Sequence, residues 1–179
     1  GYVGRRRPFT LHFVLRPEPA PDDGFVWDEQ GLDEQATAAG GARSGAVLRW
    51  DSPPDAPVRL RVGVSLVDGQ AALANLEAEV GAPADLGAVR QAARSAWLER
   101  LGRVRVAGGT AAEREIFYTA LYNAYRMPTR IDAPDGRYVG LDGQVHSTGG
   151  EFAYYTDLSL WDSFRTTHPW YLLAAPELA

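Results

Sequence analysis

The chain has 179 residues, and 45% of them are hydrophobic, which is enough for a packed core and argues against disorder. Its net charge is −5 and its one basic block is residues 5–7, so the composition does not support nucleic-acid binding. Every basic residue is arginine and cysteine is absent, which excludes Schiff-base lysines, disulfides and thiolate catalysis. The sequence shows neither a signal peptide nor an apolar run of about 20 residues that could cross a bilayer.

The first 80 residues alternate between apolar and polar positions, as strands do. Residues 10–16, 45–51 and 58–68 follow this two-residue period. One apolar and one polar face is typical of an antiparallel sheet or sandwich. In the third segment the apolar face is predicted to consist of Val58, Leu60, Val62, Val64 and Leu66, with Arg59 and Arg61 on the polar face.

The period then changes to 3.6 residues, which predicts helices. Residues 86–101 carry an apolar stripe, and Asp85 can cap the start of this helix. Thr110 and Glu113 have the spacing of a capping box for a second helix, which should end before Pro128.

The last third of the chain contains a predicted hairpin and further helix. Asp142 and Gly143 suit a tight turn between two short strands. A short helix is expected to begin at Ser159 or Asp157 and to be interrupted by Pro169. Strands followed by helices predict an α+β chain or two successive domains.

Two stretches of the sequence carry a family resemblance. Residues 114–146 (REIFYTALYNAYRMPTRIDAPDGRYVGLDGQVH) and 154–177 (YYTDLSLWDSFRTTHPWYLLAAPE) resemble glycoside hydrolase family 92, the bacterial exo-acting α-mannosidases, and SLWDSFRTTHP is the most specific part. The chain departs from the family's usual residues at Asn123, Met127 and Leu158, where the family often has histidine, histidine and phenylalanine.

The resemblance implies an architecture. Family members are several times longer than this chain and combine an N-terminal β-sandwich, a helical linker and an (α/α)6 barrel. Residues 1–80 would then be part of the antiparallel β-sandwich, 81–130 the helical linker and 131–179 the first helices of the catalytic barrel. The fold class expected from this is an α+β multidomain segment, which needs the rest of the barrel as a partner.

The resemblance also implies a function. Family members remove terminal α-linked mannose from glycans by an inverting, calcium-dependent mechanism, and they are secreted or held in the cell envelope. An inverting glycosidase needs a general acid and a general base. The resemblance places both, and the calcium ligands, beyond this segment, so no catalytic or metal-binding residue is predicted here.

Three residues are predicted to bind substrate: Trp161, Asp162 and Arg165. Residues i and i+3 share a helix face, so Asp162 and Arg165 can pair or act together on one ligand. An indole can cover the apolar face of a pyranose, while a carboxylate that arginine keeps ionised can accept from two adjacent hydroxyls. The pattern alone favours core packing for the aromatic residues and a solvated ion pair for Asp162 and Arg165, and the family resemblance is what favours a sugar site.

The sequence is also compatible with other interpretations. The aspartates of residues 132–142 lack EF-hand spacing and predict a surface turn, and His168 is interpreted as structural. The chain could instead be a non-catalytic carbohydrate-binding or interaction module with a β-sandwich fold, or an inactive relative. If it is a piece of a barrel, the isolated segment should not turn over substrate, and it should expose the apolar surfaces of Trp161, Phe164, Trp170 and Leu172.

Overall fold

A computed structural model describes residues 9–52, 57–81, 85–156 and 159–178. The predicted alternative cap Asp157 and the family departure Leu158 lie outside these residues. The elements, in chain order, are β1 (His12–Glu18), β2 (Asp23–Asp28), β3 (Gly31–Asp33), β4 (Gly45–Arg49), β5 (Arg59–Ser65), α1 (Gly69–Glu79), α2 (Leu86–Leu101), α3 (Ala111–Ala124), β6 (Thr129–Arg130), β7 (Arg137–Val139), β8 (Val145–Ser147), β9 (Tyr155–Thr156), α4 (Leu160–Ser163), α5 (Thr167–Ala174) and the 3₁₀ helix η1 (Pro176–Leu178).

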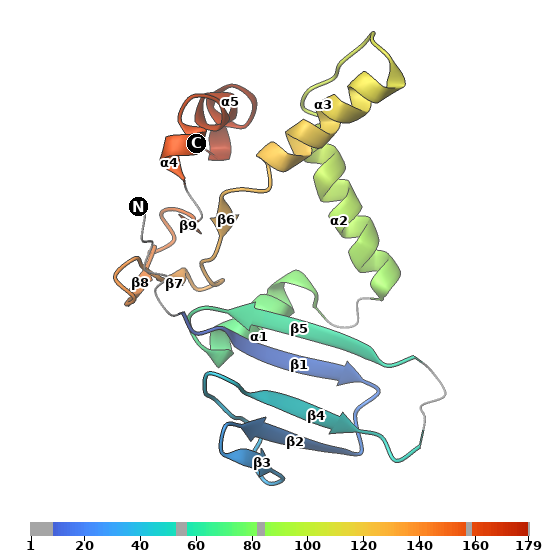
Figure 1. Ribbon diagram of the computed structural model, residues 1–179, viewed down its shortest axis with the longest axis vertical. Helices are drawn as coiled ribbons and strands as arrows, with labels where there is room; N and C mark the ends of the chain where they lie inside the picture. The colour runs from blue at the N-terminus through green and yellow to red at the C-terminus, as the bar shows by residue number, and fades with distance from the viewer. Residues whose placement is uncertain (1–8, 53–56, 82–84, 157–158, 179) are drawn as a thin grey trace.

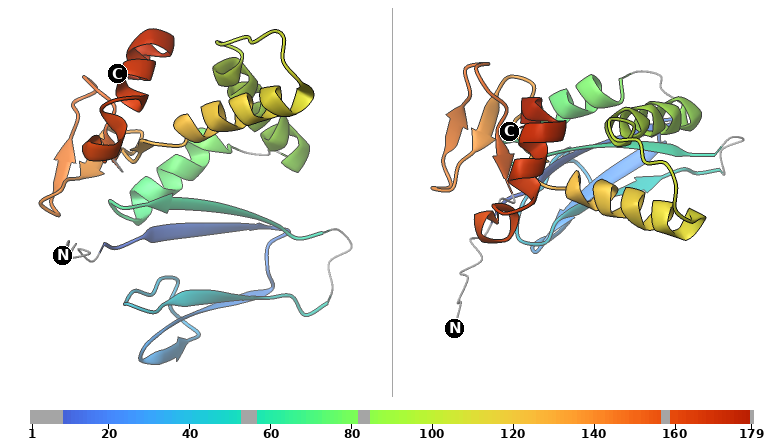
Figure 2. Two further views of the ribbon diagram at one scale, coloured as in Figure 1. Left: turned by 45° about the horizontal axis from the view of Figure 1, so that its top comes forward. Right: turned by 90° about the horizontal axis from the view of Figure 1, so that it is seen from above.

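The first five strands form two antiparallel sheets at one end of the molecule (Figure 1). Strand β1 pairs with β5, and β2 lies between β3 and β4. Strands at the three predicted segments are therefore confirmed. Figures 1 and 2 show β1 and β4 as neighbours that run in the same direction. Because the sheets pair separately, a complete sandwich stays a prediction, as does the barrel.

Helix α1 packs against β1 and β5, although this region was predicted to belong to the strand-rich first 80 residues. Asp68 caps its start, because the side chain accepts a hydrogen bond from the backbone N–H of Ala71 at 2.7 Å. Ala71, Ala72 and Leu76 are buried and form the core of this part of the chain.

The helix covers the face of β5 that was predicted to be exposed. Gly63 and Ser65 are buried beneath it, whereas Leu60, Val62 and Val64 on the predicted core face are 47–50% exposed. The residues share faces as predicted, but the expectation that the apolar face would be the covered one was wrong for the described part of the chain. The physical reason is size, since a helix backbone can approach a strand closely only over residues as small as glycine and serine.

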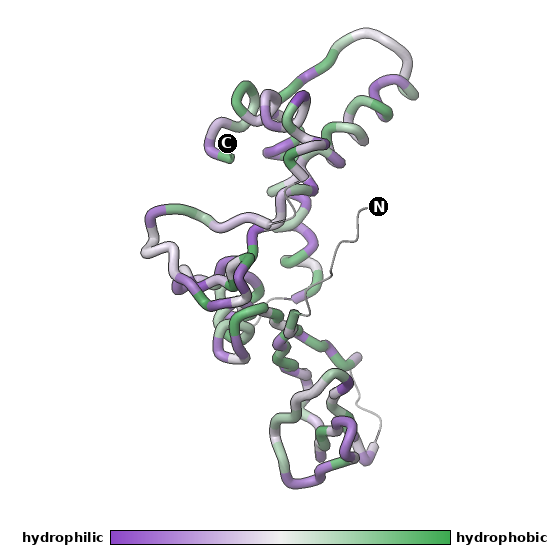
Figure 3. Tube along the Cα trace, turned by 60° about the vertical axis from the view of Figure 1, so that its left-hand side comes forward, coloured by the Kyte–Doolittle hydropathy of each residue, from purple (hydrophilic) through white to green (hydrophobic). Residues whose placement is uncertain are grey.

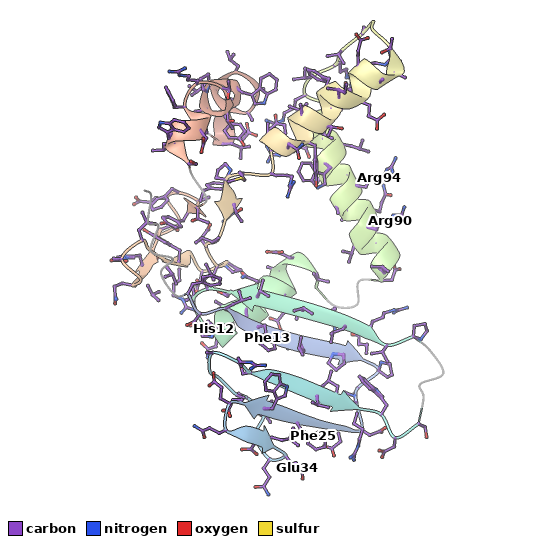
Figure 4. The ribbon with its side chains drawn as sticks, in the orientation of Figure 1. His12, Phe13, Phe25, Glu34, Arg90 and Arg94 are labelled. Carbon is purple, nitrogen blue, oxygen red and sulfur yellow. The ribbon has the colours of Figure 1, made fainter. Side chains whose placement is uncertain are left out.

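Helices α2 and α3 begin directly after the capping residues that the sequence predicted. Asp85 accepts from the N–H of Ala88 at 2.7 Å, and the capping box of Thr110 and Glu113 is complete. The two helices meet through Trp97 and Tyr122, whose ring centroids are 4.5 Å apart. Figure 4 shows Arg90 and Arg94 extending from α2 on the side away from α4 and α5.

The C-terminal third confirms one prediction and corrects another. Strands β7 and β8 pair around Gly143, which has a φ of 81° and so needs glycine's conformational freedom. Pro169, however, lies in the first turn of α5, and the interruption falls before it, at residues 164–166. Proline is tolerated in a first turn because its missing N–H would lack an intrahelical partner there.

Hydrophobic and hydrophilic segments alternate along the chain (Figure 3). Consistent with this, none of the described helices is long and apolar enough to cross a membrane.

Candidate functional site

A cavity of about 270 Å³ lies where the end of α3 meets α4 and α5. Asp162 lines it, together with Asn123 from α3 and His168 from α5. Trp161 and Arg165, the other two predicted substrate-binding residues, do not line it. The structure thus places one of the three residues in the lining of this cavity and the other two outside it.

The end of α3 is held to α5 by one buried tyrosine. Tyr171 is only 2% exposed, and its one hydroxyl proton is shared between the carbonyls of Ala124, at 2.6 Å, and Met127. Its ring stacks on Tyr125 with centroids 6.0 Å apart. Burial raises the pKa of the Tyr171 hydroxyl, which favours the protonated, donating form. This contact brings Asn123 to the cavity.

Hydroxyl groups surround Asp162. Ser159 is the residue before α4, and its hydroxyl donates to the Asp162 carboxylate. The Ser163 hydroxyl donates to the Ser159 carbonyl at 2.9 Å and lies 3.0 Å from Nε2 of His168. The carboxylate is therefore oriented by a neighbouring serine.

The predicted pairing of Asp162 with Arg165 is not formed. Helix α4 ends at Ser163, so the i, i+3 geometry of a helix face does not extend to Arg165. The guanidinium of Arg165 lies over the Phe164 ring instead, 5.1 Å from its centroid. Trp161 is 84% exposed, and its indole is open on the surface.

Sequence reasoning missed the polar side chains that accompany Asp162. Ser159 and Ser163 are four residues apart and flank Asp162, which is a local signal that could have been used. Asn123 carries no such signal, because it is distant from Asp162 in the sequence and only the fold brings the two together. His168 was interpreted as structural.

The aspartates of the preceding turn and hairpin are engaged by basic groups. Asp132 has a side chain only 2% exposed and accepts two hydrogen bonds from Arg130, at 2.8 and 2.7 Å. These bonds hold the pKa of the Asp132 carboxyl below its usual value. Asp135 binds Arg137 at 2.6 Å, and Asp142 lies 3.0 Å from His146.

The exposed side chains of Asp135 and Asp142 agree with the predicted surface turns, whereas the buried side chain of Asp132 does not. In the described part of the chain, no group of three or more histidine or acidic side chains is arranged to hold a metal ion. The described residues therefore do not by themselves fit a calcium ion.

Comparison with known proteins decides the family. The family model for the glycosyl hydrolase family 92 catalytic domain matches residues 71–179, more than half of the chain. The chain belongs to glycosyl hydrolase family 92. The match includes the cavity, α4 and α5, so the resemblance based on residues 114–146 and 154–177 is confirmed.

Individual family 92 relatives are much longer than this chain. The family 92 glycosyl hydrolase ccman5 is 32% identical, with a TM-score of 0.80 over 95% of this chain and 22% of its own. A family 92 inverting mannosidase from Bacteroides thetaiotaomicron is 28% identical, with a TM-score of 0.79 over 95% of this chain and 23% of its own.

A fungal protein is similar as well. An uncharacterized secreted glycosidase from Arthroderma benhamiae is 28% identical over 61% of this chain and 16% of its own length. The chain thus spans less than a quarter of each of these three proteins. Because one of them is fungal, similarity of this kind does not by itself indicate a bacterial source.

Proposed function

We propose that residues 1–179 are part of an inverting, calcium-dependent glycosidase that removes terminal α-linked mannose from glycans. In this proposal the segment supplies sugar-binding side chains, while the general acid, the general base and the calcium ligands lie outside it. Family membership and the inverting mannosidase among the similar structures support the reaction. The observation that carries the role of this segment is the position of Asp162 in the cavity between α3, α4 and α5.

The cavity has the chemistry that one sugar ring requires. Its volume of about 270 Å³ is close to the lower end of small-ligand pockets, about 300 Å³. Asp162 accepts only one hydroxyl hydrogen bond within the described residues, so its carboxylate can still accept from adjacent sugar hydroxyls. Asn123 adds an amide that both donates and accepts.

Trp161 and Arg165 complete the proposed sugar site from outside the cavity. The exposed indole of Trp161 can cover the apolar C–H face of the ring. Arg165 would leave the ring of Phe164 and join the ligand beside Asp162.

The proposal assigns catalysis to other residues. Inverting glycosidases use two carboxyl groups about 6.5–9.5 Å apart. Asp162 is the one acidic residue among the described residues that line the cavity, and it is assigned to sugar binding. The isolated segment is therefore proposed to bind mannosides without hydrolysing them.

Partners and location follow from the same proposal. The proposed substrate is a mannose-containing glycan that the protein encounters outside the cell or in the cell envelope. The fungal relative is named as a secreted glycosidase, which supports this location. Like Trp161, Phe164 and Leu172 are exposed, at 53% and 65%, whereas Trp170 is only partly exposed and does not follow the prediction. The remainder of the catalytic barrel is the proposed cover for these apolar side chains.

Calorimetric titration with methyl α-D-mannopyranoside tests the proposal. The wild-type chain should bind it more tightly than methyl β-D-galactopyranoside. Asp162→Asn should weaken binding by about tenfold or more, because hydrogen bonds to a charged group are stronger than neutral ones. Asp142→Asn, a change on the exposed hairpin, is the control and should leave affinity unchanged.

Three results would contradict the proposal. Equal affinity of the wild type and Asp162→Asn would show that Asp162 does not bind the sugar. Absence of binding by the wild type would show that the cavity is not a sugar site. Release of mannose by the 179-residue chain would show that the catalytic groups lie within it.

A further inference from the structure

The helix that carries Asp162 is too short to hold its own position. Helix α4 spans Leu160–Ser163, has no buried residue, and receives no side-chain cap from Ser159. The first four N–H groups and last four C=O groups of any helix lack intrahelical partners, so a four-residue helix has little internal support. The position of Asp162 must therefore depend on contacts from outside α4.

One side-chain hydrogen bond joins α4 to α5 in the described part of the chain. It connects the Ser163 hydroxyl to Nε2 of His168 at 3.0 Å. Helix α5 is itself anchored, because Tyr171, three residues after His168, binds the carbonyl of Ala124 at the end of α3. A continuous set of contacts thus leads from α3 through α5 to α4.

The Ser163–His168 bond can form with either neutral form of the imidazole. A serine hydroxyl has one proton and can also accept. While it donates to the Ser159 carbonyl, Nε2 of His168 must carry a proton and donate to the serine oxygen. The Ser159 carbonyl also accepts from the backbone N–H groups of Asp162 and Ser163, at 2.9 and 3.0 Å. The hydroxyl can therefore turn to an unprotonated Nε2 without leaving that carbonyl unpaired.

We propose that His168 is a positioning residue, which fixes α4 through Ser163 and so keeps the Asp162 carboxylate at the cavity. Ser159 then sets the orientation of the carboxylate through its own hydroxyl. The functional consequence rests on the proposed sugar-binding role of Asp162, whereas the anchoring of α4 does not. Since His168 also lines the cavity, the test must separate positioning from direct contact with the sugar.

Four variants of the whole chain make that separation: Ser163→Ala, His168→Phe, His168→Gln and the Ser163→Ala/His168→Phe double variant. Affinity for methyl α-D-mannopyranoside is the first readout. The second is the hydrogen-exchange rate of the backbone amides of Asp162 and Ser163, which both donate to the carbonyl of Ser159, the residue before α4. This readout reports on α4 without any ligand, and the thermal midpoint of each variant checks that it is folded.

Ser163→Ala and His168→Phe each remove the bond. Each should weaken binding by about tenfold and accelerate exchange of both amides. The double variant should be no worse than either single variant, because all three remove the same hydrogen bond. His168→Gln should recover most of the affinity, since its side-chain amide can donate to or accept from the Ser163 hydroxyl.

Several results would overturn the proposal. Additive losses in the double variant would mean that His168 or Ser163, which both line the cavity, contacts the sugar itself. Unchanged amide exchange in both single variants would mean that the bond does not support α4. If the wild-type chain binds no mannoside, the proposed function fails, and the exchange rates alone then decide whether His168 anchors α4.

Discussion

The guanidinium of Arg137 lies 2.6 Å from Oδ2 of Asp68, the residue that caps α1. The other carboxylate oxygen of Asp68 accepts the N–H of Ala71 at 2.7 Å. One side chain therefore starts the helix that covers the sheet and also binds the hairpin β7–β8. The hydrogen bond from Arg137, followed by that from Ala71, lowers the pKa of the Asp68 carboxyl.

Replacing Asp68 should cost more than replacing an ordinary cap. We expect Asp68→Ala to lower the free energy of unfolding by about 1–2 kcal/mol, from loss of the cap and of a partly exposed ion pair. Asp85→Ala is the matched control, because Asp85 caps α2 at the same 2.7 Å and has no arginine partner among the described residues. It should cost about 1 kcal/mol. Equal losses in urea unfolding would show that Arg137 adds no stability through Asp68.

A methyl group at Gly63 should force α1 away from the sheet. A Cβ there would lie 2.2 Å from the carbonyl oxygen of Ala72 and 2.7 Å from Cβ of Leu76. Because the nearest atom belongs to a helix backbone, Gly63→Ala should destabilise the chain by about 1–3 kcal/mol. The control is Gly69→Ala, where a Cβ would meet nothing within 4 Å, and it should be neutral or slightly stabilising. Similar unfolding midpoints for both variants would contradict close packing at Gly63.

Gly63 also shows why one part of the fold could not be predicted. The alternation of residues 58–68 gave the strand correctly, but it gave no information on which face a helix would cover. The apolar residues suggested one face, whereas the small residues Gly63 and Ser65 admit α1 on the other. Caps were easier to predict, because Asp85 and the Thr110 capping box act within one helical turn.

The candidate site also has a part that the sequence predicts and a part that it does not. Asp162 was predicted because a local motif contains it. Its ion pair with Arg165 is not formed, because helix α4 ends at Ser163, and a helical pattern does not reveal where tertiary contacts end a helix. Asn123 joins the cavity only because Tyr171 fixes the end of α3, and contacts between distant segments leave no short-range signal.

Acid should selectively remove the stabilising effect of Asp132. Its carboxyl has a lowered pKa, chiefly from the hydrogen bonds donated by Arg130. A carboxyl with a depressed folded-state pKa stabilises the fold above its unfolded pKa of about 3.9, and the effect is lost as pH falls through the folded-state value. Asp132→Asn should therefore lower the free energy of unfolding by about 1.5–3 kcal/mol near pH 7, and by progressively less below pH 4.

A surface pair with the same spacing provides the control for Asp132. Arg49 and Asp51 are also two residues apart, but they lie 3.3 Å from each other and the Asp51 side chain is 70% exposed. Asp51→Asn should change stability by less than about 1 kcal/mol at either pH. A difference between wild type and Asp132→Asn that stays constant from pH 7 to pH 3 in denaturant titrations would refute the prediction.

Removing the Tyr171 hydroxyl should loosen the end of α3 from α5. Tyr171→Phe keeps the ring but leaves the carbonyls of Ala124 and Met127 without this donor, and it should cost about 1–3 kcal/mol in unfolding free energy. Tyr122→Phe is the control, since the described residues offer its hydroxyl no hydrogen-bond partner, and it should cost little.

The dependence of stability on pH in alkaline solution provides a second test of the Tyr171 contact. Burial raises the pKa of its hydroxyl in the folded chain. The unfolded chain therefore ionises first, at about pH 10, and the stabilising contribution is lost as pH rises through the folded-state pKa. Wild-type stability should fall above pH 10 more steeply than that of Tyr171→Phe. Parallel stability curves for the two proteins from pH 8 to pH 11 would show that this hydroxyl is not held in a buried, donating position.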